Sequence, residues 1–134
     1  MVTKAYQDLS AIIDSAGLCI FFAVRNLAAK DLGVAPVGIL EYLNAATGAA
    51  YTLEELMQAG ERIINAERLF LTKAGFTRKD DSLPERLTQT PAPTGPAKGL
   101  VCHLDKMLDE YYRVRGWTEN GIPTQEILNR LGLS

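Results

Sequence analysis

Histidine and cysteine are scarce in this 134-residue chain, which contains one histidine and two cysteines. A single histidine, His103, excludes a multi-histidine metal site built from this chain alone. Cys19 and Cys102 lie too far apart in sequence to form a local metal knuckle, and a domain with an adequate apolar core does not need a disulfide. The sequence leaves open whether the two thiols pair.

The chain also lacks an excess of either charge and lacks long apolar runs. Its 14 basic and 16 acidic side chains give a formal charge of −2, so no broad attraction to nucleic acid or anionic lipid is expected. Runs such as residues 18–24 fall far short of the roughly 20 residues that cross a bilayer, and we find no signal-peptide pattern. We therefore expect a soluble, cytoplasmic protein that binds neither nucleic acid nor membranes.

Apolar residues recur at the spacing typical of α-helices. With 47% apolar residues the chain can bury a core, and we expect residues 1–134 to fold as a single domain. No alternating β pattern is present, so the fold class is all-α, an irregular bundle of about five to six helices. Periodicity and capping residues predict helices over about 2–16, 19–29, 36–46, 52–74, 101–115 and 124–131. The helix over 19–29, which is almost wholly apolar at first, is the expected central element.

The predicted helix that begins near Thr52 has the strongest local signals. Thr52 and Glu55 have the spacing of a capping box, and Gly75 is typical of a helix C-terminus. The stripe expected to face the core is Leu56, Met57, Gly60, Ile63, Ile64, Phe70, Leu71 and Ala74. Residues 76–99 lose the periodicity, and their four prolines and two glycines predict a long surface connection. A connection of this length is either functional or packed against something that the sequence does not include.

Asp14 and Cys19 are the strongest candidates for chemistry, because a carboxylate and a thiol lie five residues apart around Gly17. On an uninterrupted helix, five steps of about 100° would separate the two side chains by roughly 140°, whereas a break at Gly17 would let both serve one site. The alternative is that Asp14 belongs to a helix terminus and Cys19 is an ordinary buried apolar side chain. From the residues alone, Cys19 is a candidate ligand of a shared site, since an iron–sulfur cluster normally requires four thiolates.

The stretch 14–19, D-S-A-G-L-C, with Phe21 and Phe22 after it, resembles the second pterin-binding motif of the tungsten-containing aldehyde:ferredoxin oxidoreductases. The resemblance continues, in the order found in that family, over residues 61–68, 75–86, 107–112, 115–117 and 121–124. Together these stretches span essentially the whole chain. They identify it as similar to the C-terminal domain of that family.

The resemblance implies a role in cofactor binding. In that family an aldehyde and water become a carboxylic acid, and the electrons pass through a tungsten bis-pterin and a [4Fe-4S] cluster to ferredoxin. Asp14 would then hydrogen-bond one pterin and Cys19 would be the fourth cluster thiolate, within a segment that includes Gly17 and Leu18. The family's catalytic residues and its other cluster cysteines precede the matched region, so the resemblance implies no catalytic residue in this chain.

The same resemblance implies several partners. The chain would be a C-terminal domain or split subunit that needs an N-terminal tungstopterin domain or subunit, with ferredoxin and an aldehyde as partners of the complete enzyme. We expect the chain alone to bind no cofactor, to be inactive, and to self-associate through the apolar face near Cys19. The alternative function is a non-enzymatic helical module that binds a protein partner.

Three other groups admit both structural and functional interpretations. A cysteine and a histidine at 102–103 are adjacent, so they project about 100° apart on a helix and make a poor metal pair. The mixed charges of residues 78–81 either form exposed ion pairs or dock a partner domain. Tyr111, Tyr112 and Trp117 either line a substrate channel or pack the last helix, and their large area favours packing.

Overall fold

The computed structural model describes residues 2–21 and 37–134, and all regular structure within these ranges is helical. The elements are α1 (Val2–Ser15), α3 (Val37–Thr47), α4 (Leu53–Lys73), the 3-10 helix η1 (Arg78–Asp80), α5 (Glu85–Thr88), α6 (Leu104–Arg115) and α7 (Gln125–Leu131). The described ranges contain β pairing only as two isolated bridges. The predicted all-α class is confirmed, and no helix in the described part of the chain is long and apolar enough to span a bilayer.

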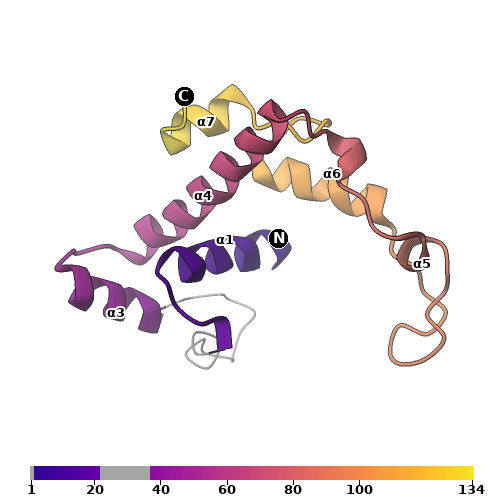
Figure 1. Cartoon of the computed structure of the whole chain (residues 1–134), viewed down its shortest axis with the longest axis horizontal. Helices are drawn as coiled ribbons and strands as arrows, with labels where there is room; N and C mark the ends of the chain where they lie inside the picture. Colours follow the sequence, from indigo (N-terminus) through magenta and orange to yellow (C-terminus); the bar gives the residue numbers. More distant parts are fainter. Residues whose placement is uncertain (1, 22–36) are drawn as a thin grey trace.

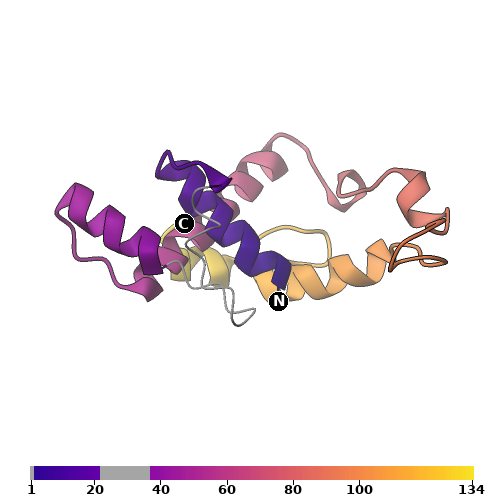
Figure 2. The same ribbon diagram turned by 90° about the horizontal axis from the view of Figure 1, so that it is seen from below.

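The long helix α4 is the element around which the other described helices are arranged (Figures 1 and 2). α1, α3 and α7 all contact α4, and α1 also contacts α6. The sequence predicted instead that a helix over about 19–29 would be central. Apart from residues 19–21, that stretch lies outside the described residues, so its place in the bundle stays a prediction.

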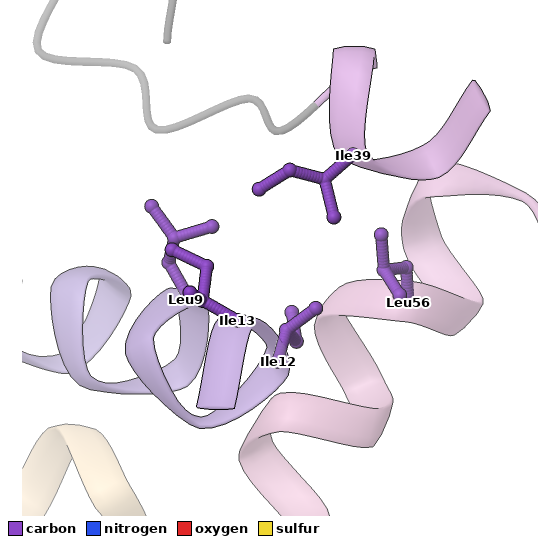
Figure 3. Packing of buried hydrophobic residues seen from close by; sticks show 5 residues of the cluster. All are labelled: Leu9, Ile12, Ile13, Ile39 and Leu56. Atoms are coloured by element: carbon purple, nitrogen blue, oxygen red, sulfur yellow. The ribbon is translucent and has the colours of Figure 1, made fainter. Parts of the chain in front are cut away.

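A small apolar core joins α1, α3 and α4 (Figure 3). Its buried members are Leu9, Ile12, Ile13, Ile39 and Leu56. Burying a large aliphatic side chain contributes roughly 1.5–3 kcal/mol, so this cluster attaches α1 and α3 to the N-terminal half of α4. Leu18, just beyond the end of α1, packs against the same core. The core therefore anchors the turn that follows α1.

Gly60 determines how closely α1 and α4 approach. A Cβ atom at this position would lie 2.3 Å from the carbonyl oxygen of Asp8 and 3.1 Å from Cδ1 of Ile12. Glycine in a helix interior costs about 1 kcal/mol relative to alanine, so helix propensity does not explain its presence. The close crossing of the two helices does explain it.

The prediction of a continuous apolar stripe along α4 is wrong for the C-terminal half of the helix. Leu56 faces the core as expected, whereas Phe70 is 72% exposed. From Glu61 onward, the buried positions are instead Glu61, Asn65 and Arg68. Hydrophobic periodicity assigns such residues to the solvent face, but here each has hydrogen-bond or ion-pair partners that offset its desolvation.

Residues 76–99 form the long connection that the sequence predicted, with η1 and the four-residue α5 as its helices. In both views the part around α5 projects away from the other helices (Figures 1 and 2). Its backbone is hydrogen-bonded locally: the Ala92 N–H donates to the Leu100 carbonyl at 3.0 Å, and the Cys102 N–H donates to the Leu87 carbonyl at 2.8 Å. The connection is therefore locally ordered although it leaves Leu87 and Leu100 exposed.

Candidate functional site

The segment from Asp14 to Cys19 forms the turn that ends α1. The Leu18 N–H donates to the Ile13 carbonyl at 3.0 Å, and the Gly17 N–H donates to the Asp14 carbonyl at 3.1 Å, which together make a Schellman motif. Gly17 has φ of +68°, a left-handed conformation that favours glycine. The helix break predicted at Gly17 is confirmed, so helical geometry does not force the two side chains apart.

The residues of this turn differ sharply in exposure. Leu18 packs against the core, whereas Asp14 and Cys19 are exposed. Ile20 and Phe21, which begin a further helical turn, are 40% and 81% exposed. Cys19 is an exposed free thiol, so the core of this chain does not bury it. The turn thus presents a thiol and a carboxylate next to exposed apolar side chains.

Asp14 occupies a position that helix stability does not favour. It lies in the last turn of α1, where the partial negative charge of the helix terminus disfavours a carboxylate by typically 0.3–1 kcal/mol. No basic residue lies in that turn, and no hydrogen bond or ion pair within the described ranges involves the Asp14 side chain. The carboxylate is therefore free to accept hydrogen bonds from a ligand with N–H donors.

The thiol and carboxylate do not form a complete metal site by themselves. An iron–sulfur cluster is normally held by four thiolates, and the part of the chain that the structure describes contains no group of three or more metal-binding side chains. The second thiol, Cys102, is also free and lies beside Met107, with 3.7 Å between the two sulfur atoms. Cys19 therefore fits a cluster as one ligand among others that come from outside this chain.

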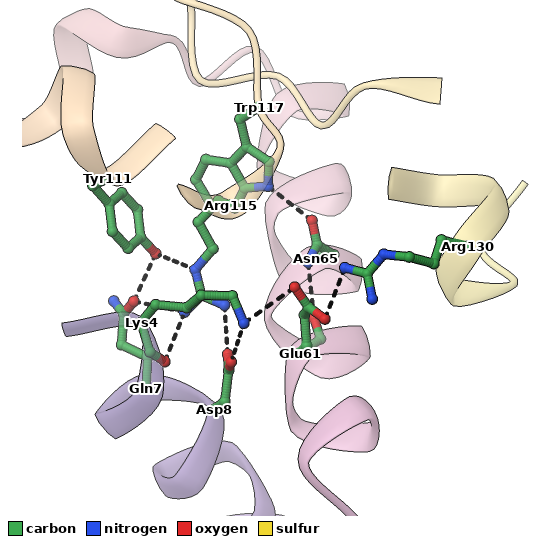
Figure 4. Close-up of polar contacts among 9 residues, drawn as sticks. All are labelled: Lys4, Gln7, Asp8, Glu61, Asn65, Tyr111, Arg115, Trp117 and Arg130. Atoms are coloured by element: carbon green, nitrogen blue, oxygen red, sulfur yellow. Dashed lines mark hydrogen bonds and ion pairs between the residues drawn. The ribbon is translucent and has the colours of Figure 1, made fainter. Parts of the chain in front are cut away.

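A buried polar network that sequence reasoning missed holds α1 in place (Figure 4). Arg115 on α6 is fully buried, forms an ion pair with Asp8, and donates to Gln7 Oε1 at 2.8 Å. Lys4 Nζ lies 2.7 Å from a carboxylate oxygen of Asp8 and 3.1 Å from one of Glu61. These contacts connect α1 to both α4 and α6.

The network continues along α4 through Glu61 and Asn65 (Figure 4). Arg130 of α7 forms an ion pair of 2.9 Å with Glu61, and Trp117 Nε1 donates to Asn65 Oδ1 at 2.8 Å. Burial alone would raise the pKa of Glu61, but hydrogen bonds from Arg130 and Lys4 hold this pKa below its ordinary value. Among the described residues, every buried side-chain nitrogen and oxygen has a hydrogen-bond partner.

A second polar cluster attaches the residue after η1 to α4. Arg68 donates to the two carboxylate oxygens of Asp81 at 2.8 and 2.5 Å, and its Nε donates to the Gly121 carbonyl at 2.7 Å. The Tyr112 hydroxyl also donates to Asp81. Burial and this hydrogen bond raise the pKa of Tyr112 to about 12. Against the effect of burial, Arg68 and Tyr112 hold the pKa of Asp81 below its ordinary value.

The aromatic residues near the end of α6 pack together, which confirms the packing interpretation. The ring centroids of Tyr111 and Trp117 lie 5.5 Å apart in an edge-on arrangement, and those of Tyr112 and Trp117 lie 5.8 Å apart. Two of the charges in residues 78–81 also have ion-pair partners within the chain: Arg78 lies 2.8 Å from Asp109, and Asp81 pairs with Arg68. These groups hold the helices together.

The sequence contained a signal for the buried networks, although not in its apolar pattern. Glu61, Asn65 and Arg68 recur at four- and three-residue steps, which places them on one face of a helix. All three lie within 61–68, a stretch that carries the family resemblance, and 115–117 is another such stretch. The resemblance thus includes residues whose role here is to fix the positions of the helices.

Comparison with known proteins supports the same relationship. The family described as aldehyde ferredoxin oxidoreductase, domains 2 & 3, matches residues 1–133. The tungsten-containing aldehyde ferredoxin oxidoreductases of Pyrococcus abyssi and Pyrococcus furiosus are 48% and 47% identical to this chain, in alignments that cover 96% of it and 20% of each relative. The aliphatic sulfonate oxidoreductase, WOR-like subunit, of Pyrococcus furiosus is 33% identical over 93% of this chain and 20% of the relative.

The chain thus spans about a fifth of the length of the curated relatives it matches. The family match nevertheless extends over nearly all of its residues, including the turn at 14–19 and both polar networks. The chain belongs to the aldehyde ferredoxin oxidoreductase family, in which it corresponds to the C-terminal domain.

Proposed function

We propose that this chain is the C-terminal part of a tungsten-pterin, iron–sulfur oxidoreductase that oxidises aldehydes to carboxylic acids and passes the electrons to ferredoxin. The observation that carries the proposal is the exposed, free thiol of Cys19 directly after the turn at Gly17. The chain is more similar to relatives named for aldehyde oxidation than to the aliphatic sulfonate oxidoreductase subunit, which supports an aldehyde as the substrate.

Each residue of the turn has a separate role in this proposal. Cys19 supplies one thiolate to a [4Fe-4S] cluster whose other ligands come from the N-terminal part of the enzyme or from a partner subunit. Asp14 accepts hydrogen bonds from N–H groups of one pterin, and its negative charge strengthens them. Gly17 supplies the left-handed backbone, and Leu18 fastens the turn to the core. When bound, the cofactors supply the oxidising chemistry and the path for electrons.

Metal analysis of the full-length or reconstituted enzyme tests the role of Cys19. With Cys19→Ala, iron and acid-labile sulfide should fall well below the wild-type content, and electron transfer to ferredoxin should be lost, because one of four thiolates is missing. Cys102→Ala is the matched control, since that half-buried thiol lies beside Met107 and should be dispensable for both readouts. Normal iron content and turnover in Cys19→Ala would overturn the proposed ligand role.

A non-enzymatic helical module that binds a protein partner is the second candidate function. The exposed apolar side chains of Ile20 and Phe21 favour it, because a protein partner would cover them. The discriminating experiment is to purify the complex that contains this chain from its natural source and to measure tungsten and iron. Stoichiometric tungsten and iron in that complex would exclude the module, and a metal-free complex would exclude the oxidoreductase.

A further inference from the structure

We propose that the buried Asp8–Arg115 ion pair is a positioning device, which fixes α1 so that its C-terminal turn presents Asp14 and Cys19 at defined places. This inference rests on the proposed function, since it concerns the same two residues. Neither Asp8 nor Arg115 touches the cofactors in this proposal. Both act through the helix that carries the turn.

Stability alone does not account for a charged pair at this depth. Arg115 is 0% exposed and Asp8 is 1% exposed. Removing two charges from water costs several kcal/mol for each ion, and apolar residues of similar volume often serve stability equally well or better. Arginine adds directional hydrogen bonding, because the N–H donors of its planar guanidinium have fixed directions and their acceptors must lie in a matching arrangement.

Arg115 holds successive positions of α1. Besides its ion pair with Asp8, its guanidinium donates to the Gln7 side chain at 2.8 Å and to the Lys4 carbonyl at 3.4 Å. These acceptors span about one turn of the helix. Rotation of α1 about its axis, or sliding along it, would break at least one of these contacts, whereas aliphatic packing resists such movements less specifically. The hydroxyl of Tyr111 accepts from Arg115 Nε at 2.9 Å and so orients the guanidinium.

Asp8 is also held from the side of α4. The missing side chain of Gly60 lets the backbone of α4 approach the Asp8 carbonyl, where a Cβ would lie 2.3 Å from the oxygen. From Asp8 to Ser15 the helix is continuous, a length of about 10 Å at 1.5 Å per residue. A tilt of about 5° at Asp8 would therefore move the turn by roughly 1 Å, a displacement large enough to disturb a reactive geometry.

The chain contains a second arginine–aspartate pair that can serve as a control for the Asp8–Arg115 pair. Arg68 and Asp81 form a second arginine–aspartate pair beside aromatic rings, with the Arg68 guanidinium 5.0 Å from the Trp117 ring centroid. Within the described ranges, the hydrogen bonds of Arg68 reach Asp81 and Gly121 and none reaches α1. Weakening this pair should destabilise the fold without moving the turn.

The test uses the complete enzyme and reads the cluster directly. Arg115→Lys keeps the charge but removes the planar donors, and Tyr111→Phe removes a single hydroxyl from the same network. At wild-type iron content, both variants should change the electron paramagnetic resonance spectrum of the reduced cluster and shift its midpoint potential. Arg68→Lys should lower the unfolding temperature as much as Arg115→Lys does and leave the spectrum and potential unchanged. If Arg115→Lys does not fold, Tyr111→Phe decides.

Two results would overturn the positioning role. One is a wild-type spectrum and potential in both Arg115→Lys and Tyr111→Phe, and the other is an equal change in Arg68→Lys. If Cys19→Ala loses iron but Arg115→Lys and Tyr111→Phe both keep the wild-type spectrum and potential, the positioning inference fails and the proposed function stands. If Cys19→Ala retains iron, the proposed ligand role fails and the positioning role fails with it.

Discussion

Asp8 and Arg115 lie in the interior with opposite charges, and their partners satisfy them completely among the described residues. Truncating one member of such a pair leaves the other charge buried and unpaired, which costs about 3–5 kcal/mol, whereas exposed ion pairs contribute roughly 0–1 kcal/mol. In the pair between Glu61 and Arg130 the arginine side chain is 51% exposed. Its contribution to stability should therefore be closer to that of an exposed ion pair. Truncation at these few buried positions should therefore destabilise the fold more than truncation in an exposed pair.

Tyr112, which is also buried, should make a pH-dependent contribution to stability. Its pKa is raised to about 12 by burial and by its hydrogen bond to Asp81, above the value near 10 of an unfolded tyrosine. The folded state thus favours the protonated hydroxyl, so this contribution to stability is complete below about pH 10 and is lost as the pH rises toward 12. Ultraviolet titration should show a late phenolate step that Tyr112→Phe removes. Persistence of that step in the variant would contradict the assignment.

Sequence reasoning identified the exposed residues of the candidate site but not the buried ones that support it. The break at Gly17 was predicted, because it depends on neighbouring residues, whereas the residues alone left open whether Cys19 is exposed. The partners Asp8 and Arg115 are 107 residues apart in sequence, so no local pattern links them. A charged residue is rarely buried without such a partner, so composition gives no reason to place either residue in the interior.

At the scale of elements, the ends of the helices were predictable and their contacts were not. Thr52 and Glu55 form the predicted capping box, with the Thr52 N–H donating to the Glu55 carboxylate at 2.8 Å. Thr124 caps α7 and Gly116 ends α6 in a left-handed conformation, also as predicted. Such ends depend on residues within one turn, whereas the face of α4 that packs inward depends on residues far away in sequence, such as Trp117, which lies 52 positions from its partner Asn65.

Gly60→Ala tests whether the crossing of α1 and α4 depends on glycine. The added methyl group would meet the backbone of Asp8, so the helices must separate, at a typical cost of 1–3 kcal/mol for overpacking. Helix propensity favours alanine by about 1 kcal/mol, which reduces the net loss without reversing it. Urea unfolding should show lower stability than the wild type, while Glu67→Ala on the exposed part of α4 should change it by under about 0.5 kcal/mol. A more stable Gly60→Ala protein would contradict a close crossing.

At the scale of the whole molecule, every buried side-chain nitrogen and oxygen of residues 2–21 and 37–134 has a hydrogen-bond partner, whereas several large apolar side chains in these ranges are exposed. Ile20 and Phe21 are exposed beyond the turn, and Leu87 and Leu100 are exposed in and just after the connection over residues 76–99. The sequence indicated both regions as possible contact surfaces, and the structure identifies the apolar side chains in them that are exposed. Since the relatives are about five times as long as the matched region, we expect the remainder of the enzyme to cover these surfaces.

Without that remainder, we expect the chain to self-associate through the surface that carries Phe21. Burial of an aromatic side chain contributes up to about 3 kcal/mol, and a symmetric contact would bury two copies of it. Light scattering during size-exclusion chromatography should show a mass that rises with concentration, and Phe21→Ser should shift the chain toward the monomer. Phe70→Ser is the matched control, because Phe70 is 72% exposed compared with 81% for Phe21 but lies on α4 rather than beyond the turn. A wild-type chain that stays monomeric at all concentrations, or equal effects of the two substitutions, would show that the turn is not the contact surface.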